Sequence, residues 1–176
     1  MPRVETAYIQ LGGNKPETPG WFFRCVSEEI PLLGKITALS SCYETEPWGF
    51  DSPDRFLNAV VAVETDLSPE QLMQTLLGIE KKAGRHRKSE KGYESRILDL
   101  DVLALGEQIV NKKTIILPHP RLHLRNFVLQ PFSQIAAQWV HPILGKTTLE
   151  LLAGCTDPSE IKRLTNQYAA LAIFGG

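Results

Sequence analysis

Two acidic side chains lie inside an otherwise apolar run of the chain, Ile97-Leu98-Asp99-Leu100-Asp101-Val102-Leu103. The run is bulky and largely branched, which predicts a β-strand. Side chains alternate along a strand, so Asp99 and Asp101 share one face, with Cα atoms about 6.6 Å apart. Because unpaired buried carboxylates are costly, the pair suits a hard cation such as Mg²⁺, which usually arrives with phosphates. Taken alone, a half-exposed edge strand with a polar outer face explains the pair equally well.

A cluster of cationic side chains precedes the acidic run and decides between these interpretations. The cluster follows Gly84, which is typical of a helix end, and consists of Arg85, His86, Arg87, Lys88, Lys91 and Arg96. A charged run is usually a solvated loop. Beside two carboxylates, however, guanidinium groups can donate charge-assisted hydrogen bonds to phosphates that metal ions bridge. The combination favours a site for Mg²⁺ and a nucleoside triphosphate.

Length and composition indicate one ordinary globular domain. The chain has 176 residues, 43% of them hydrophobic and 22% charged, and its formal net charge is −1. No global field therefore attracts nucleic acid or a membrane, and any basic site is local. The three cysteines lack the spacing of a disulfide framework or a zinc site. We recognise no signal peptide or membrane-spanning run, so we expect a cytoplasmic protein without nucleic-acid or membrane partners.

The pattern of apolar residues predicts alternating strands and helices. We expect strands over 6–11, 35–45, 56–65 and 97–103, helices over 21–33, 68–84 and 127–140, and a hairpin over 107–117. Ser68-Pro69-Glu70-Gln71 is a strong helix start, because Ser caps helices and Pro suits their first position. The first six elements match the split β-α-β-β-α-β pattern, which predicts an α+β fold with an antiparallel sheet and helices on one face.

A stiff segment after the hairpin carries two candidate anion ligands. His119 lies between two prolines, and Arg125 follows six residues later. Both side chains offer hydrogen-bond donors, so a rigid loop could direct them at a phosphate. A loop that leads into a helix and carries incidental charges explains them as well.

The segment from Glu46 to Asn58 contains residues that could bind a flat aromatic ligand. Trp48 and Phe56 offer ring faces for stacking, and the amide of Asn58 offers both a donor and an acceptor to a heterocycle edge. The residues alone favour the simpler interpretation, in which Phe56 and Asn58 only begin a strand.

Together these residues resemble a known family, the 6-hydroxymethyl-7,8-dihydropterin pyrophosphokinases (HPPK) of folate synthesis. The blocks occur in the family's order over roughly residues 6 to 137, and they are Leu11–Asn14, Tyr43–Gly49, Phe56–Ala59, Gly84–Arg87, Arg96–Asp101, Pro118–Pro120 and Arg125–Leu129. Each block is weak alone, but the ordered set is specific. The resemblance implies a ferredoxin-like fold and transfer of the β,γ-pyrophosphoryl group of ATP to the pterin's hydroxymethyl oxygen, with release of AMP.

The resemblance also implies roles for individual residues. Asp99 and Asp101 would hold two Mg²⁺ ions, and the catalytic residues would be Arg85, Arg96, Asp99 and Asp101. The residues expected to contact the co-substrate ATP are Glu80, Arg85, Arg87, Arg96, His119 and Arg125. The residues expected at the pterin are Thr45, Glu46, Trp48, Phe56, Asn58, Asp99 and Phe127, with Phe56 and Phe127 sandwiching the ring. We expect a monomer that acts on small molecules.

The chain departs from the family's pattern in several places. The segment between Arg87 and Arg96 is one residue longer and offers Tyr93 as a replacement for the usual aromatic. Gly13 stands where Ser is usual, and Glu46 stands where Pro is common. We assign residues 1–144 to the pyrophosphokinase domain. Residues 145–176 match nothing in the family, and we expect a C-terminal helical extension of the same domain, with helices over 149–152 and 160–173.

Other functions remain open from the residues. A different Mg²⁺-dependent nucleotidyl or phosphoryl transferase could present the same acidic pair, but it would release ADP or pyrophosphate instead of AMP. A regulatory module would bind a small molecule without turnover and would still bind it after Asp99 and Asp101 were neutralised. RNA binding is less favoured, because it needs a broad basic or aromatic surface.

Overall fold

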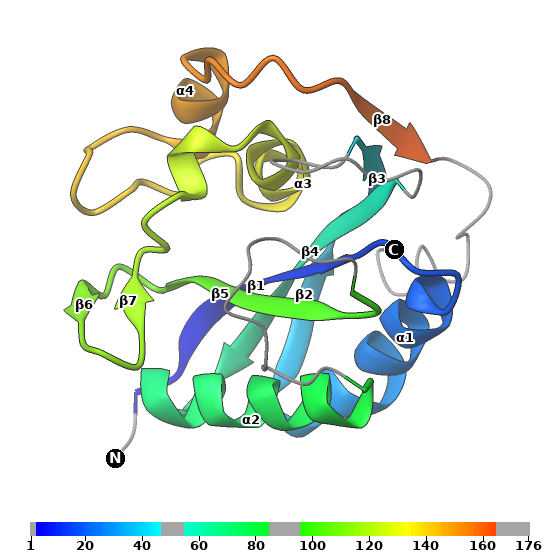
Figure 1. The fold of residues 1–176 in the computed structure, drawn as a ribbon. Coiled ribbons are helices and arrows are strands. Elements are labelled where there is room, and N and C mark those ends of the chain that lie inside the picture. Colours follow the sequence, from blue (N-terminus) through cyan, green and yellow to red (C-terminus); the bar gives the residue numbers. More distant parts are fainter. Residues whose placement is uncertain (1–2, 47–54, 85–95, 165–176) are drawn as a thin grey trace.

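The computed structural model describes residues 3–46, 55–84 and 96–164 of the chain (Figure 1). Its strands are β1 (Glu5–Gly13), β2 (Lys35–Leu39), β3 (Cys42–Thr45), β4 (Phe56–Thr65), β5 (Asp99–Leu105), β6 (Val110–Asn111), β7 (Ile116–Leu117) and β8 (Ile161–Leu164). Its α-helices are α1 (Thr18–Arg24), α2 (Pro69–Lys82), α3 (Asn126–Ala136) and α4 (Thr148–Ala153). A π-helical turn (Cys25–Glu29) and two 3₁₀ turns (Ile30–Leu32 and Leu122–Leu124) complete the helical elements.

Six strands form one antiparallel sheet in the order β5-β1-β4-β3-β8, and β2 also pairs with β4. The expected strand over 35–45 is therefore two strands on the same neighbour. Ser40 bridges the break, because its backbone N–H donates to the Val60 carbonyl and its side-chain oxygen accepts from the Val60 N–H. The expected hairpin over 107–117 is confirmed as the two short strands β6 and β7.

Helices cover both faces of the sheet, so the prediction of helices on one face is wrong (Figure 1). Ile9 and Leu11 of β1 belong to the hydrophobic cluster that includes α1 and α2. Tyr8 packs on the other face against Phe132 of α3 and against Trp139. The reason lies in β4, where the consecutive residues Val60–Val63 are all buried and therefore require cover on each side.

The start of α2 matches its sequence signal in detail. Ser68 Oγ accepts a hydrogen bond from the Gln71 N–H, and Gln71 Oε1 accepts one from the Ser68 N–H. Leu72, Leu76 and Ile79 are buried and form the helical stripe that packs under the sheet. α2 therefore provides a rigid layer beneath β5, the strand that carries the two aspartates.

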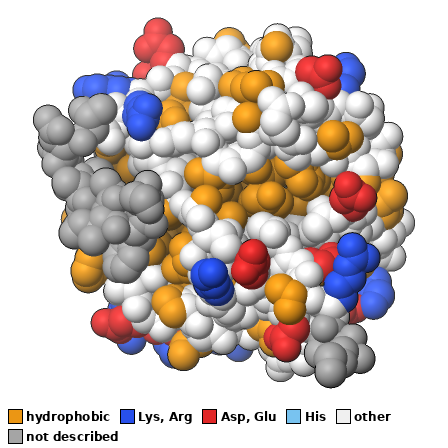
Figure 2. Space-filling view, turned by 180° about the vertical axis from the view of Figure 1, so that it is seen from behind, with side chains coloured by type: hydrophobic (Ala, Val, Ile, Leu, Met, Phe, Trp, Pro, Cys, Tyr) orange, Lys and Arg blue, Asp and Glu red, His pale blue; other side chains and the backbone are white. Residues whose placement is uncertain are grey.

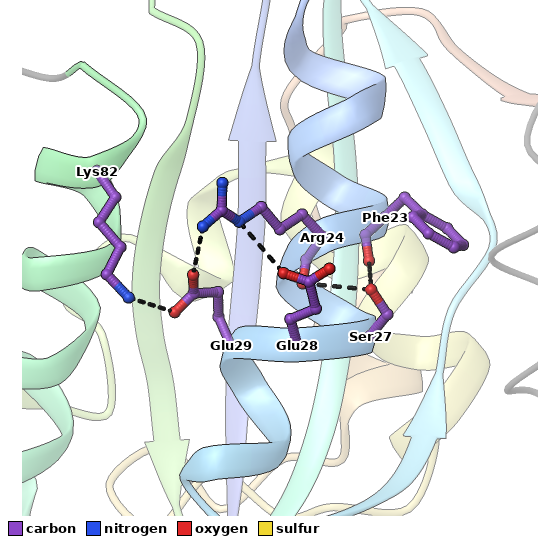
Figure 3. A network of polar contacts seen from close by, with 6 residues as sticks. All are labelled: Phe23, Arg24, Ser27, Glu28, Glu29 and Lys82. Carbon is purple, nitrogen blue, oxygen red and sulfur yellow. Dashed lines mark hydrogen bonds and ion pairs between the residues drawn. The ribbon is translucent and has the colours of Figure 1, made fainter.

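The first helical region is less regular than the expected helix over 21–33. It changes from α to π to 3₁₀ geometry before β2, with Pro31 in the last turn. Figure 3 shows how this region is tied to α2. The buried Glu29 carboxylate lies 3.4 Å from Arg24 Nη2 and 2.8 Å from Lys82 Nζ. The two cations compensate a carboxylate that would otherwise be costly to bury.

The C-terminal part of the chain contains one of the two expected helices. α4 includes the expected residues 149–152 and begins with a capping box formed by Thr147 and Glu150. The expected helix over 160–173 is wrong for residues 161–164, which form strand β8 and pair with the outer edge of β3. Residues 165–173 lie outside the described residues. Because β8 extends the main sheet, this tail is not a purely helical extension.

One face of the molecule exposes both hydrophobic and charged side chains (Figure 2). Figure 2 shows hydrophobic side chains in a band across the middle of one face, with acidic and basic side chains placed around it in small groups. In the described ranges, no helix is long and apolar enough to cross a membrane.

Candidate active site

The two aspartates lie at the start of β5, on the face of the sheet that α3 covers. Both side chains are partly exposed, whereas Leu98, Leu100 and Val102 are buried on the opposite face. The alternation predicted from the sequence is therefore confirmed. Partial exposure leaves the carboxylates accessible to a ligand instead of enclosing them in the core.

The neighbouring strand leaves open space beside the aspartates. In the register between β1 and β5, Gly12 lies opposite Asp99 and Gln10 lies opposite Asp101. A Cβ atom at Gly12 would reach 3.6 Å from Asn58 Oδ1 and 3.9 Å from Asp99 Cβ. The missing side chain therefore keeps the floor clear between the acidic group of β5 and the amide of β4.

A pocket of about 570 Å³, including its open mouth, occupies this position. Its lining residues come from β1, β3, β4, β5, the start of α3 and the residues next to these elements. They are Gln10, Gly12, Thr45, Glu46, Phe56, Asn58, Arg96, Asp99, Asp101, Arg125 and Phe127. Three strand spacings of about 4.8 Å separate β5 from β3, so the floor is roughly 14 Å wide.

A row of hydrogen-bonded side chains crosses the pocket floor. Gln10 Nε2 donates to Asn58 Oδ1 at 3.2 Å, and Asn58 Nδ2 donates to Thr45 Oγ1 at 3.2 Å. All three residues are buried, at 6%, 3% and 2% exposure, and they come from three adjacent strands. Each amide group has a second N–H and at least one carbonyl lone pair in addition to these bonds. The row can therefore recognise the polar edge of a heterocycle while its own geometry is fixed.

Arg96 joins the acidic group to the segment that follows α2. Its Nη1 lies 3.1 Å from Asp99 Oδ2. The buried Asn14 holds the backbone of Arg96 in both directions, because Asn14 Oδ1 accepts from the Arg96 N–H at 2.7 Å and the Asn14 N–H donates to the Arg96 carbonyl at 2.9 Å. These two hydrogen bonds fix the position of the Arg96 backbone just before β5 begins.

Gly13 explains one departure from the family's usual sequence. A Cβ atom there would overlap the Ile97 carbonyl oxygen and lie 2.7 Å from the side-chain atoms of Thr18. Thr18 Oγ1 itself donates to the Ile97 carbonyl at 2.7 Å. In this chain the position is therefore restricted to glycine by close packing.

The start of α3 contributes the remaining wall. Arg125 is 8% exposed, and its guanidinium carbon lies 5.6 Å from the centre of the Phe127 ring. The Asn126 N–H at the first helical position donates to Asp157 Oδ2 at 2.9 Å. A carboxylate from the C-terminal tail thus contacts the helix turn that carries both pocket residues.

His119 lies close behind this site but does not line the pocket. Burial, followed by the positive charges of Arg125 and Arg121, lowers the pKa of His119 from 6.5 to about 4. The ring is therefore neutral near pH 7. Its Nδ1 accepts from the Arg121 N–H at 3.2 Å, which assigns the proton to Nε2.

Glu80 lies on the core side of β5. It is 2% exposed on α2, and its Oε1 accepts from the Leu100 N–H at 2.8 Å. The Glu80 carboxylate thus contacts β5 at Leu100, which lies between the two aspartates in the sequence. It does not line the pocket. A direct contact between Glu80 and ATP stays a prediction.

The structure brings together most of the residues that the sequence analysis selected. Those that line the pocket are Thr45, Glu46, Phe56, Asn58, Arg96, Asp99, Asp101, Arg125 and Phe127. Those that fall outside the described residues are Trp48, Arg85, Arg87 and Tyr93. The sequence analysis missed Gln10, Gly12 and Asp157. A polar Gln in a strand of apolar residues was the available signal for Gln10, whereas Asp157 gave no local signal.

The chain is similar to known proteins over most of its length. Residues 8–137 match the model of the 7,8-dihydro-6-hydroxymethylpterin-pyrophosphokinase (HPPK) family. The chain is 38% identical over 159 residues to the 2-amino-4-hydroxy-6-hydroxymethyldihydropteridine pyrophosphokinase of Methylorubrum extorquens, a match that covers 90% of this chain and 98% of that one. It is 39% identical over 142 residues to the folic acid synthesis protein fol1 of Pneumocystis carinii, covering 80% of this chain but only 19% of that longer protein.

Solved structures show the same architecture. The crystal structure of Plasmodium falciparum HPPK-DHPS with pteroate matches with a TM-score of 0.66 over 86% of this chain and 44% of that chain. The sequences are 13% identical, so this likeness concerns the fold. From the family match over residues 8–137 and from the M. extorquens relative, we conclude that this chain belongs to the 7,8-dihydro-6-hydroxymethylpterin-pyrophosphokinase family.

Proposed function

We propose that the pocket on the α3 face of the sheet binds the pterin and the ATP triphosphate side by side. The chain is a pyrophosphokinase of folate biosynthesis, and ATP is its co-substrate. The observation that carries the assignment is the division of the pocket floor. One end presents Asp99, Asp101 and Arg96, which suit a metal-bound polyphosphate, and the other end presents buried amide and hydroxyl groups, which suit a heterocycle.

The pterin occupies the end of the pocket near β3 and β4. Phe56 and Phe127 line it from the sheet and from α3, so the flat ring lies between two aromatic side chains. Asn58 and Thr45 face its polar edge, where an amide can pair with a ring N–H and a ring acceptor. Glu46 borders the same end. This placement directs the hydroxymethyl group towards β5.

The acidic end fits two Mg²⁺ ions that arrive with the nucleotide. Mg²⁺ is usually held by one or two carboxylates together with substrate phosphates, and Asp99 and Asp101 supply carboxylate oxygens on one face. The open floor at Gly12 gives the phosphates room beside them. When bound, the ions would neutralise charge on the phosphates during transfer.

The cationic residues hold the triphosphate. Arg96 neutralises Asp99 in this structure, and nucleotide binding would turn its guanidinium from the carboxylate to phosphate oxygens. Arg125 lines the pocket at the start of α3. The resemblance implies that His119 also contacts the triphosphate, and its neutral ring carries a proton on Nε2 that a phosphate oxygen could accept. Arg85 and Arg87, for which the resemblance implies further phosphate contacts, lie outside the described residues.

The reaction follows from this arrangement. The hydroxymethyl oxygen attacks the β-phosphorus of ATP and forms a new oxygen–phosphorus bond. The bond from the β-phosphorus to the oxygen shared with the α-phosphorus breaks, and AMP leaves with that oxygen. The hydroxyl proton passes to Asp101 or to water. Arg96 and Arg125 stabilise the negative charge that develops on the transferred group and on AMP.

We infer that the fold is the ferredoxin-like split β-α-β-β-α-β sheet with additions. The strand order places β1 beside β4 and β5, and it places β2 and β3 together at the position of one outer strand. The additions are α3 and α4 on the second face and β8 at the edge. Residues 1–144 then form the catalytic unit, and the tail from residue 145 belongs to the same domain.

Analysis of the nucleotide product tests this function. The purified chain is incubated with ATP, Mg²⁺ and 6-hydroxymethyl-7,8-dihydropterin, and the nucleotides are separated by chromatography. We expect AMP and the pterin pyrophosphate in equal amounts, and no AMP when the pterin is omitted. Release of ADP or of free pyrophosphate would indicate another transferase. Binding of both substrates without turnover would indicate a regulatory module instead.

A further inference from the structure

The C-terminal tail contacts both walls of the pocket, although the sequence analysis found no role for it. Figure 1 shows the tail running from α4 to β8, which lies beside β3. We call residues 155–164 the strap. At one end the strap carries Asp157, which contacts the start of α3, and at the other end it forms β8.

Asp157 caps α3 from a distant part of the sequence. The residue at the N-cap position of α3 is Arg125, and its side chain forms no capping hydrogen bond. Instead, Asp157 Oδ2 accepts from the Asn126 N–H at 2.9 Å. A carboxylate in this position satisfies a free backbone donor and interacts favourably with the positive end of the helix.

The carboxylate of Asp157 is itself held in place. Its Oδ1 accepts from the Ser159 N–H at 3.0 Å and from Ser159 Oγ at 2.5 Å. Partial burial acts to raise the pKa of this carboxyl group, but the hydrogen bonds from Ser159 and Asn126 and the charge of Arg125 outweigh it and lower the pKa. Asp157 is therefore ionised whenever the enzyme works near neutral pH.

The other end of the strap supports the opposite wall. In the register between β3 and β8, Ile161 lies opposite Thr45 and Arg163 lies opposite Tyr43. Arg163 Nε also donates to Ser41 Oγ at 2.9 Å. Thr45 is the last residue of β3 and a member of the hydrogen-bonded row on the pocket floor.

We infer that the strap sets the separation of the two pocket walls, with Asp157 as a positioning residue that places Phe127 over the pterin. This inference rests on the proposed pterin site. Phe127 follows Asn126 directly in the first turn of α3, so the bond that fixes the Asn126 N–H also fixes the direction of the Phe127 side chain. Loss of the carboxylate loosens this turn while β3 and the floor stay intact.

The test compares three variants of the strap with a matched control. Asp157→Ala removes the cap, Asp157→Asn keeps one acceptor oxygen, and Ser159→Ala removes the side-chain bond that orients Asp157. Glu160→Ala is the control, because Glu160 is an exposed acid on the same strap. Pterin affinity is measured by calorimetry with Mg²⁺ and a non-hydrolysable ATP analogue, and the affinity for the analogue is measured separately.

We expect pterin affinity to fall about fivefold in Asp157→Ala, as for the loss of a helix cap, and by less in the other two strap variants. Affinity for the ATP analogue is expected to change less than twofold, since Arg125 is one of several cations at the triphosphate. Unchanged pterin affinity in Asp157→Ala, or an equal loss for both ligands, would overturn the inference. Because these variants are compared with a wild-type chain that releases AMP, a wild type without AMP release would instead refute the proposed function.

Discussion

The hydrogen bond between Gln10 and Asn58 provides a quantitative test of the pocket floor. Gln10→Ala removes the Nε2 donor that lies 3.2 Å from Asn58 Oδ1. A neutral hydrogen bond of this kind contributes about 1 kcal/mol net, which corresponds to roughly a fivefold change in an equilibrium constant. Because the proposed pterin site places Asn58 at the polar edge of the ring, we expect Gln10→Ala to weaken pterin binding by about this factor, although Gln10 belongs to none of the motifs that define the family resemblance.

A double-mutant cycle separates this effect from general damage to the pocket. Pterin affinity is measured by calorimetry for wild type, Gln10→Ala, Asn58→Ala and the double variant, and a coupling energy of about 0.5–1.5 kcal/mol is expected. Gln108→Ala is the matched control, because Gln108 also donates a side-chain hydrogen bond, at 3.1 Å to Glu5 Oε2, but does not line the pocket. Additive effects of the two substitutions, within about 0.3 kcal/mol, would refute the reasoning.

Four further substitutions test other parts of the site. Asp99→Asn or Asp101→Asn should abolish AMP release with little change in the thermal unfolding temperature, because both carboxylates are partly exposed; near-normal turnover in both variants would contradict the metal assignment. Phe127→Ala should weaken pterin binding more than tenfold and ATP binding much less, as titrations of each ligand can show; equal losses would argue against stacking. The unfolded chain takes up a proton at His119 near pH 6.5 and the folded chain only near 4, so the free energy of unfolding should fall as pH decreases through this window. His119→Asn should flatten that dependence in denaturant titrations, and an unchanged slope would exclude His119 as its source.

Local signals predicted the elements that carry the acidic group. The alternation of leucine and aspartate fixed which face of β5 carries Asp99 and Asp101, because a strand has a period of two. Ser68 and Gln71 predicted the start of α2 correctly, since a capping box depends only on residues that are close in sequence. Such features are readable because their physical cause lies within a few residues.

Features that depend on distant contacts were not predictable in the same way. The place of Gln10 in the pocket follows from its register opposite Asp101 and from its bond to Asn58, and the sequence of one strand does not contain that register. Asp157 caps a helix 31 residues away, so it has no local signature. The helix expected over 160–173 is wrong at residues 161–164 for a similar reason, because pairing with the edge of β3 holds these residues in an extended conformation.

One error could have been avoided from the sequence. Val60–Val63 of β4 form a continuous apolar run, whereas a sheet with one solvent-facing side shows alternating polar residues. The run indicated that the central strand is covered on both faces, as α3 and α4 show. The second layer matters for function, because the pocket lies between it and the sheet.

The close packing around Gly13 limits how sequence can be exchanged between members of this family. Serine, which is usual at this position, would bring its Cβ atom into the Ile97 carbonyl and the Thr18 side chain. A smaller neighbour at Thr18 alone would not make room, because the shortest contact is with the backbone oxygen of Ile97. A serine transferred to this position from another member of the family would therefore displace the backbone at Ile97, two residues before Asp99.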